Sequence, residues 1–271
     1  MIDVLHLFPK LNSSLIDVLD GLSSQQWNNA SICKKWTVKD IAAHLLDGTL
    51  RRLSIGRDGY PNALPDINSY RDLLDYLNSL NADWVKAFKR VSPKILIEQL
   101  GAAQDQLYNY LLTLDPAAPA LFPVLWAGED RSSNWFDIAR AYTECWLHQQ
   151  QIRQAVGAEP LLGKELYLPF LGISMQALAH HYQRIMAPSG TTVRVEIVGD
   201  AGGSWCIVYK DQAWEFGGLE KEADAQVYID QHIAWMLFSK GMDFNEARQY
   251  WQVIGDYELG SHALKMVTVI A

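Results

Sequence analysis

Apolar residues recur every three or four positions through the first two thirds of the chain, which predicts a series of amphipathic helices. The first such helix follows Pro9, a residue suited to a first helical turn, and its apolar face is formed by Leu11, Leu15, Val18, Leu19 and Leu22. The same periodicity predicts further helices over 37–55, 68–90, 93–114, 132–156 and 165–185. Two turn-rich stretches, 56–66 and 115–130, are expected to be loops between them.

The period changes from helical spacing to strict alternation after about residue 190. In 192–199, Val193, Val195 and Ile197 alternate with polar residues, the pattern of a half-buried strand. Further strands are predicted over 204–209, 212–216, 225–230 and 250–256. Helices are predicted over 232–241, in a short segment beginning near Asp243, and over 256–269.

This change of period predicts two domains that meet near residues 186–190. Residues 1–186 would form a helical bundle, and residues 187–271 would form a smaller α+β domain. The expected fold class is therefore an all-α region followed by an α+β region.

Charge and composition exclude several classes of partner. The chain has 23 basic and 31 acidic side chains, a net charge of −8 and no Lys/Arg cluster, so nucleic-acid binding is not expected. No stretch approaches the ~18 uninterrupted apolar residues that would cross a membrane. The N-terminus lacks a basic start followed by an apolar run, and the three cysteines are odd in number and far apart. We expect a cytoplasmic protein without disulfides.

The candidate chemistry lies on two of the predicted helices. His44 lies within the helix that Thr37 begins, and Asp40 follows Thr37 at the spacing of a capping box. Glu144 and His148 lie four residues apart, on one face of the 132–156 helix. Two imidazoles and a carboxylate suit Zn²⁺ or another divalent first-row metal with positions left open for water or substrate. Spacing alone equally describes residues on solvated helix faces.

A resemblance to a known family favours the metal interpretation. The stretch WTVKDIAAHL at 36–45 resembles the first metal-ligand helix of the mycothiol-dependent maleylpyruvate isomerase family, within the DinB/YfiT-like metal-binding four-helix bundles. ECWLH at 144–148 resembles the second signature of that family, a Glu followed four residues later by a His. The tail, from DAQVYID through GDYELGSHAL, is similar to the sterol-carrier-like C-terminal domain of the family.

The resemblance covers nearly the whole chain and implies three metal ligands, which are His44, Glu144 and His148. The chain departs from the family pattern at Gln151, where many relatives have an Asp three residues after the second His. A side chain at that position can orient a ligand through a hydrogen bond, and Gln does so without the charge of Asp.

The resemblance also implies the cofactors and the reaction. The metal would be zinc, with nickel, manganese and iron as alternatives that accept the same ligands. The thiol would be a low-molecular-weight one, which is mycothiol, bacillithiol or glutathione. Isomerase relatives add the thiolate to the cis double bond of maleylpyruvate and eliminate it after rotation, whereas other members of the superfamily resemble thiol S-transferases. The expected partners are that thiol and an electrophilic or unsaturated acid, and a homodimer is the expectation from base rates.

Other functions remain open from the residues alone. The C-terminal half, if sterol-carrier-like, would bind an apolar ligand among Trp205, Trp214 and Trp235, beside a non-catalytic metal in the bundle. A bundle without metal that acts as a scaffold is the third reading. Arg51 and Arg52, about two turns beyond His44, either contact an anionic substrate or face solvent.

Overall fold

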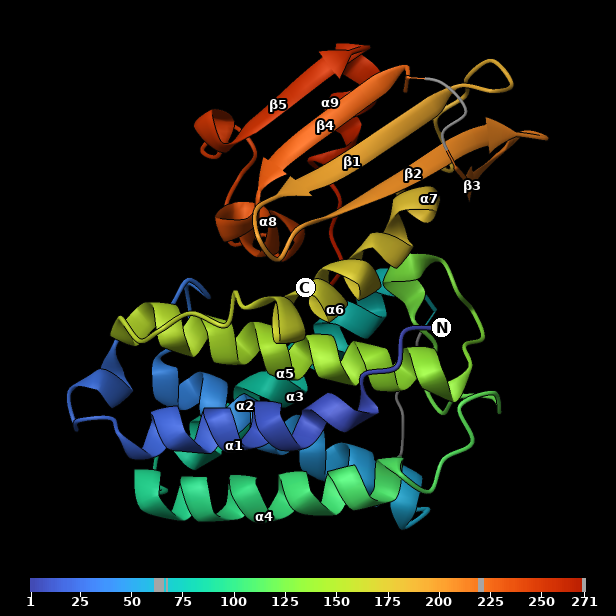
Figure 1. The fold of residues 1–271 in the computed structure, drawn as a ribbon. Helices are drawn as coiled ribbons and strands as arrows, with labels where there is room; N and C mark the ends of the chain where they lie inside the picture. Colours follow the sequence, from blue (N-terminus) through green and yellow to red (C-terminus); the bar gives the residue numbers. More distant parts are fainter. Residues whose placement is uncertain (61–65, 67, 219–221, 270–271) are drawn as a thin grey trace.

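Helices form the first part of the molecule and a five-stranded sheet with accompanying helices forms the second. The structure is a computed structural model that describes residues 1–60, 66, 68–218 and 222–269. Figure 1 shows the sheet above the helical region, in orange and red, against the blue to yellow of the bundle. The predicted fold class, an α region followed by an α+β region, is confirmed.

Five long helices make up the bundle, and four of them were predicted with similar limits. They are α1 (Phe8–Asp20), α2 (Val38–Arg52), α3 (Tyr70–Phe88), α4 (Pro93–Leu111) and α5 (Asn134–Val156). The helix predicted after Pro9 begins one residue before that proline and ends at Asp20. A π-helical turn, Leu53–Arg57, extends α2, and the loop predicted over 56–66 falls partly outside the described residues.

The caps at the helix starts are the ones that the sequence suggests. The Ser92 hydroxyl accepts a hydrogen bond from the backbone N–H of Ile95, and Pro93 occupies the first turn of α4. The Ser69 hydroxyl accepts one from the backbone N–H of Asp72 at the start of α3. These caps satisfy backbone donors that have no partner within the helix.

The helix predicted over 165–185 is confirmed from Lys164 to His181, but a 3₁₀ turn interrupts it and it ends four residues early. The chain forms α6 (Lys164–Ser174), a 3₁₀ turn (Met175–Ala177) and a short α7 (Leu178–His181). Figure 1 shows these segments between the bundle and the sheet. Because most residues from Leu166 to Leu178 are buried there, the sequence is apolar almost throughout and carries no change of period to mark the break.

The sheet contains β1 (Thr192–Val198), β2 (Gly203–Lys210), β3 (Ala213–Phe216), β4 (Ala225–Asp230) and β5 (Trp251–Gly255), in the order β3-β2-β1-β4-β5. The central pair, β1 and β4, is parallel, and the other neighbours are antiparallel. Asp211 and Gln212 turn the chain between β2 and β3 with positive φ angles of 50° and 66°. Positive φ at both central residues is the geometry of a tight hairpin that follows the strand twist.

Two predictions in the C-terminal region need correction. The helix expected near Asp243 is a set of turns that leads into a 3₁₀ segment, Arg248–Tyr250. The final helix, α9 (Tyr257–Ala263), ends six residues before the predicted limit of 269. Beyond α9, the backbone N–H of Thr268 donates to the Phe238 carbonyl at the end of α8 (Gln231–Phe238), at 2.9 Å. This tertiary contact holds the buried Thr268 outside any helix.

The bundle and the sheet region share buried core. Trp146 of α5 is fully buried, and its ring stacks on Phe170 and meets the edge of the Trp235 ring from α8. The Tyr167 hydroxyl donates to the Gln231 carbonyl at 2.7 Å. One continuous cluster of buried residues thus runs from α5 through α6 to α8. The predicted boundary at 186/187 and the sterol-carrier likeness of the C-terminal region stay predictions.

Two of the tryptophans suggested as walls of an apolar cavity pack into the core. Trp214 donates its indole N–H to the Ile185 carbonyl at 2.8 Å and lies against the rings of Tyr182 and Tyr209. Trp235 is 1% exposed. Among the described residues, no helix is long and apolar enough to cross a membrane.

Candidate metal centre

His44 is placed by the capped start of α2. The backbone N–H of Asp40 donates to the Thr37 hydroxyl at 3.3 Å, and the Asp40 carboxylate accepts from the Thr37 backbone N–H at 3.0 Å. This reciprocal capping box fixes where the helix begins. His44 follows about two turns later, and the neighbouring Ile41 and Leu45 are buried in the bundle core.

Glu144 and His148 meet His44 across the packing of α2 against α5. One potential ligand atom from each of the three side chains can be chosen so that all lie within 4.8 Å of one another. The two imidazole rings stand edge to face, with centroids 4.8 Å apart. His148 Nε2 lies 3.5 Å from Glu144 Oε2. The structure therefore brings together the three residues that the sequence analysis singled out.

The group is closed on one side and reachable on the other. The ring of Trp36, just before the helix cap, lies with its centroid 4.8 Å from His44 and 6.2 Å from His148. The side chain of His148 is 11% exposed, whereas that of Glu144 is 33% exposed. Glu144 is therefore the more exposed member of this pair, and the Trp36 ring lies against both imidazoles.

Gln151 takes part in the site as expected for a residue that orients a ligand. Its Oε1 lies 2.8 Å from His148 Nδ1, and its side chain is buried. A carboxamide oxygen only accepts, so Nδ1 carries a proton; in the neutral ring Nε2 then keeps its lone pair, and in the protonated ring Nε2 is a donor to Glu144. That lone pair belongs to the nitrogen near Glu144.

Electrostatics give His44 and Glu144 the protonation states that metal ligands need. Burial, reinforced by the charge of His148, lowers the pKa of His44 to about 3. Burial alone would raise the pKa of Glu144, but the hydrogen bond and charge of His148, with the charges of His44 and Arg140, lower it to about 2. At neutral pH, His44 is a neutral donor and Glu144 an anion.

The residues fit a divalent transition metal on two further grounds. His44 Nδ1 is buried and has no hydrogen-bond partner among the described residues, which is costly for a polar atom unless something binds it. Two imidazoles and one carboxylate are also the donor set that leaves positions open in catalytic zinc sites.

Three residues near the group were not anticipated. The side chain of Asn81, on α3, lies within hydrogen-bond reach of His44. Cys33 lies in the loop before α2, near Gln151 and Glu144, and burial raises the pKa of its thiol. Arg140 is four residues before Glu144 on α5, so helical spacing could have predicted that the two side chains lie on the same face. Asn81 and Cys33 reach the group only through tertiary packing.

Comparisons with known proteins agree with this architecture. Residues 8–153 match the family described as the mycothiol maleylpyruvate isomerase N-terminal domain. The crystal structure of a mycothiol-dependent maleylpyruvate isomerase shares the fold, with a TM-score of 0.51, 13% identity and 86% of each chain covered. A histidine-to-alanine mutant of mycothiol-dependent maleylpyruvate isomerase matches at 12% identity with a TM-score of 0.49, again over 86% of each chain. No curated protein sequence matches the chain.

A helical bundle with a His/Glu cluster between α2 and α5, followed by an α+β region, defines the class as a helical-bundle protein with a candidate metal centre. Since the family match covers more than half of the chain, this protein belongs to the mycothiol maleylpyruvate isomerase family.

Proposed function

We propose that this protein is a divalent-metal-dependent enzyme that uses a low-molecular-weight thiol. The observation that carries the proposal is the convergence of His44, Glu144 and His148, with ligand atoms within 4.8 Å of one another. Family membership supports the thiol, and mycothiol is the first candidate ahead of bacillithiol and glutathione. Zinc is the first candidate metal, because the donor set is one that catalytic zinc uses.

In this proposal, three residues bind the metal ion and a fourth orients one of them. His44, Glu144 and His148 would hold the ion. Gln151 would keep the Nε2 lone pair of His148 directed at it through the 2.8 Å contact with Nδ1. A divalent cation held there favours the thiolate over the thiol of a bound cofactor, which supplies a nucleophile at neutral pH.

The reaction is either isomerisation of a maleylpyruvate-type acid or transfer of the thiol to an electrophile. Both need a thiolate and an acceptor at the exposed Glu144 side of the group. The descriptions of the family and of the similar crystal structure, both of maleylpyruvate isomerase, favour the isomerase.

Turnover assays distinguish the two reactions. Metal-loaded protein would be incubated with mycothiol, bacillithiol or glutathione, and with either maleylpyruvate or a chromogenic aryl halide. We expect turnover with one of the thiols, its loss on chelation and its recovery when metal is restored. A His232→Ala variant, altered at an exposed histidine of α8, is the matched control and should keep full activity. If the protein binds metal but turns over neither acceptor with any thiol, the proposed enzymatic function is contradicted and a non-catalytic metal protein is supported.

A further inference from the structure

Three arginines and two aspartates gather where the C-terminal end of α2 meets the start of α5. The arginines are Arg51, Arg52 and Arg140, and the aspartates are Asp47 and Asp137. With Glu144 counted, the three arginines face three carboxylates; the charge of Arg51 acts on His44 and that of Arg140 on Glu144. What matters for ligand binding is which guanidinium still has donors to offer.

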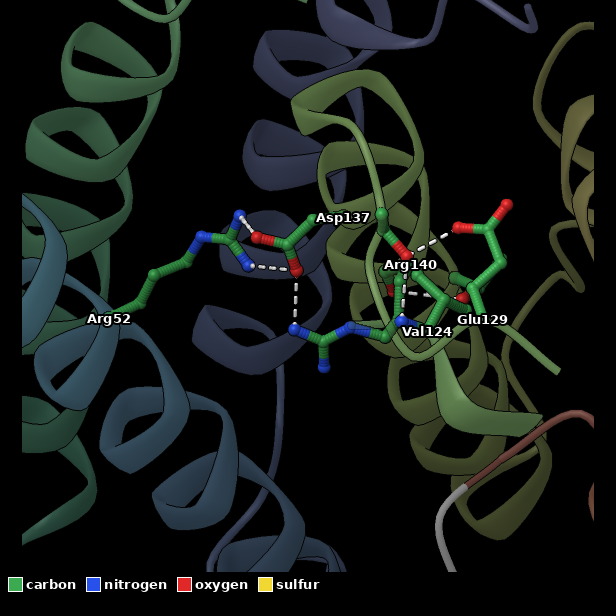
Figure 2. Close-up of polar contacts among 7 residues, drawn as sticks. Arg52, Val124, Glu129, Asp137 and Arg140 are labelled. Carbon is green, nitrogen blue, oxygen red and sulfur yellow. Dashed lines mark hydrogen bonds and ion pairs between the residues drawn. The ribbon is translucent and has the colours of Figure 1, made fainter. Parts of the chain in front are cut away.

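Arg52 and Arg140 both bind Asp137. Figure 2 shows the Asp137 carboxylate between the two guanidinium groups. Arg52 donates from both terminal nitrogens, at 3.2 and 2.6 Å, and Arg140 donates from Nη2 at 2.6 Å. The Arg52 side chain is 10% exposed. This bidentate buried pair holds α2 to α5, so Arg52 is not free to meet a substrate.

Arg51 is held differently and keeps donors free. Its Nη2 makes both recorded contacts, at 2.9 Å to Asp47 Oδ2 and 3.3 Å to Asn81 Oδ1. Its Nε is buried and has no hydrogen-bond partner among the described residues. The side chain is 30% exposed although Nε is buried, so a ligand can reach Arg51 only at its terminal nitrogens.

Arg51 is also next to the candidate metal centre. It follows His44 by seven residues on α2, which is about two turns and places both on one face. The Asn81 side chain contacts Arg51 and also acts on His44, whose pKa it raises against the larger effect of burial. Burial is the main cause of the low pKa of His44, and the charge of Arg51 contributes to it.

We propose that Arg51 binds a carboxylate of the acceptor substrate beside the His44–Glu144–His148 group. This inference rests on the proposed function and selects acids over neutral electrophiles as acceptors. A guanidinium binds a carboxylate through its N–H donors, and Nη1 of Arg51 is the donor left over, since Nη2 makes both contacts of the side chain with described residues. Asp47 and Asn81 already hold its side chain, so less rotamer freedom is lost on binding.

The test measures binding without turnover. Maleate and its dimethyl ester would be titrated into metal-loaded protein by calorimetry, with no thiol present. We expect maleate to bind and the ester not to, and Arg51→Gln to weaken maleate binding about tenfold or more. Arg51→Lys keeps a cation beside Asp47 and should fold even if the Gln variant does not. Its binding should be weakened less than that of Arg51→Gln, because the planar fork is lost but the charge is kept.

Two controls separate the possible failures. Arg71→Gln removes an exposed arginine of α3 and should leave maleate binding unchanged. Metal content, measured on every variant, should not change with Arg51. Unchanged maleate affinity in both folded Arg51 variants overturns this inference and leaves the metal centre standing. A wild-type protein that cannot be loaded with metal contradicts the proposed function, and maleate binding that still depends on Arg51 would then support the docking role alone.

Discussion

His148 Nδ1 and Gln151 Oε1 lie 2.8 Å apart, one turn along α5. The contact joins a residue that faces the His/Glu group to a buried amide behind it. It matters because the sequence departs from the family pattern at this position, and the amide contacts the His148 ring where we propose that it orients the ligand.

Replacement of Gln151 tests that role. Gln151→Leu removes the acceptor for the Nδ1–H of His148, so we expect zinc affinity to fall about 10- to 100-fold with the fold intact. Gln151→Asp keeps an acceptor and adds charge, so its affinity should equal or exceed that of the wild type. Competition with a chromogenic chelator measures both. Equal affinity in the Leu variant and the wild type would show that Gln151 does not orient the ligand.

The capping box of α2 is predicted to contribute to stability. Thr37→Ala removes the hydroxyl that accepts from the Asp40 N–H, and we expect the free energy of unfolding to fall by about 0.5–2 kcal/mol. Thr37→Ser keeps the acceptor and should stay near the wild type. Urea denaturation followed by circular dichroism compares the three proteins. A Ser variant as unstable as the Ala variant would point to the lost methyl group instead of the cap.

The buried Asp137 should be among the most sensitive residues of the bundle. Asp137→Asn leaves Arg52 and Arg140 without their shared anion, and loss of one partner of a buried ion pair costs about 3–5 kcal/mol. Asp130→Asn, at an exposed position in the preceding loop, should change stability by less than about 0.5 kcal/mol. Chemical denaturation gives both values. A loss no larger for Asp137→Asn than for the control would mean that the pair stabilises nothing.

Acid should weaken the contact between α7 and α9, where His181 and His262 stack with ring centroids 4.2 Å apart. Each ring Nε2 lies within hydrogen-bond distance of the other residue's backbone carbonyl, at 2.9 and 3.0 Å. Burial lowers the pKa of His181 from 6.5 to about 4; the hydrogen bond to the His262 carbonyl opposes the shift, and the charge of His262 adds to it. Between these values the unfolded chain binds the proton and the folded chain does not, so stability falls as pH decreases from 6.5 towards 4.

A pair of variants isolates this effect. Between pH 7 and 4.5, the wild type should lose about 2 kcal/mol more stability than His181→Gln, which has no imidazole to protonate. His232→Gln changes an exposed histidine and should follow the wild-type curve. Urea melts at each pH give the comparison. Parallel curves for wild type and His181→Gln would contradict the assigned pKa.

Capping residues and helical spacing, which are features of the local sequence, were enough to predict the start of α2 and the shared face of Glu144 and His148. The start of α2 follows from Thr37 and Asp40, and the joint placement of Glu144 and His148 follows from helical spacing. The pairing of His44 with them required the family resemblance, because spacing says nothing about which helices pack together.

Tertiary packing determines what the sequence did not reveal. The break between α6 and α7 lies in a stretch buried on nearly all sides, where periodicity is lost. Asn81 contacts Arg51 only because α3 packs on α2, and a lone Asn on a helix carries no signal of that. Beyond the end of α9 at Ala263, Thr268 bonds to the Phe238 carbonyl, a tertiary contact that local sequence does not reveal.

The metal content of the purified protein tests the central claim most directly. The protein would be prepared without chelator and without a histidine tag, and bound metals would be measured by plasma mass spectrometry. We predict about one equivalent of a transition metal in the wild type and in His232→Ala, and its loss in His44→Ala and His148→Ala. A wild-type protein that holds only trace metal, and that cannot be loaded with Zn²⁺, Ni²⁺ or Mn²⁺, would contradict the account.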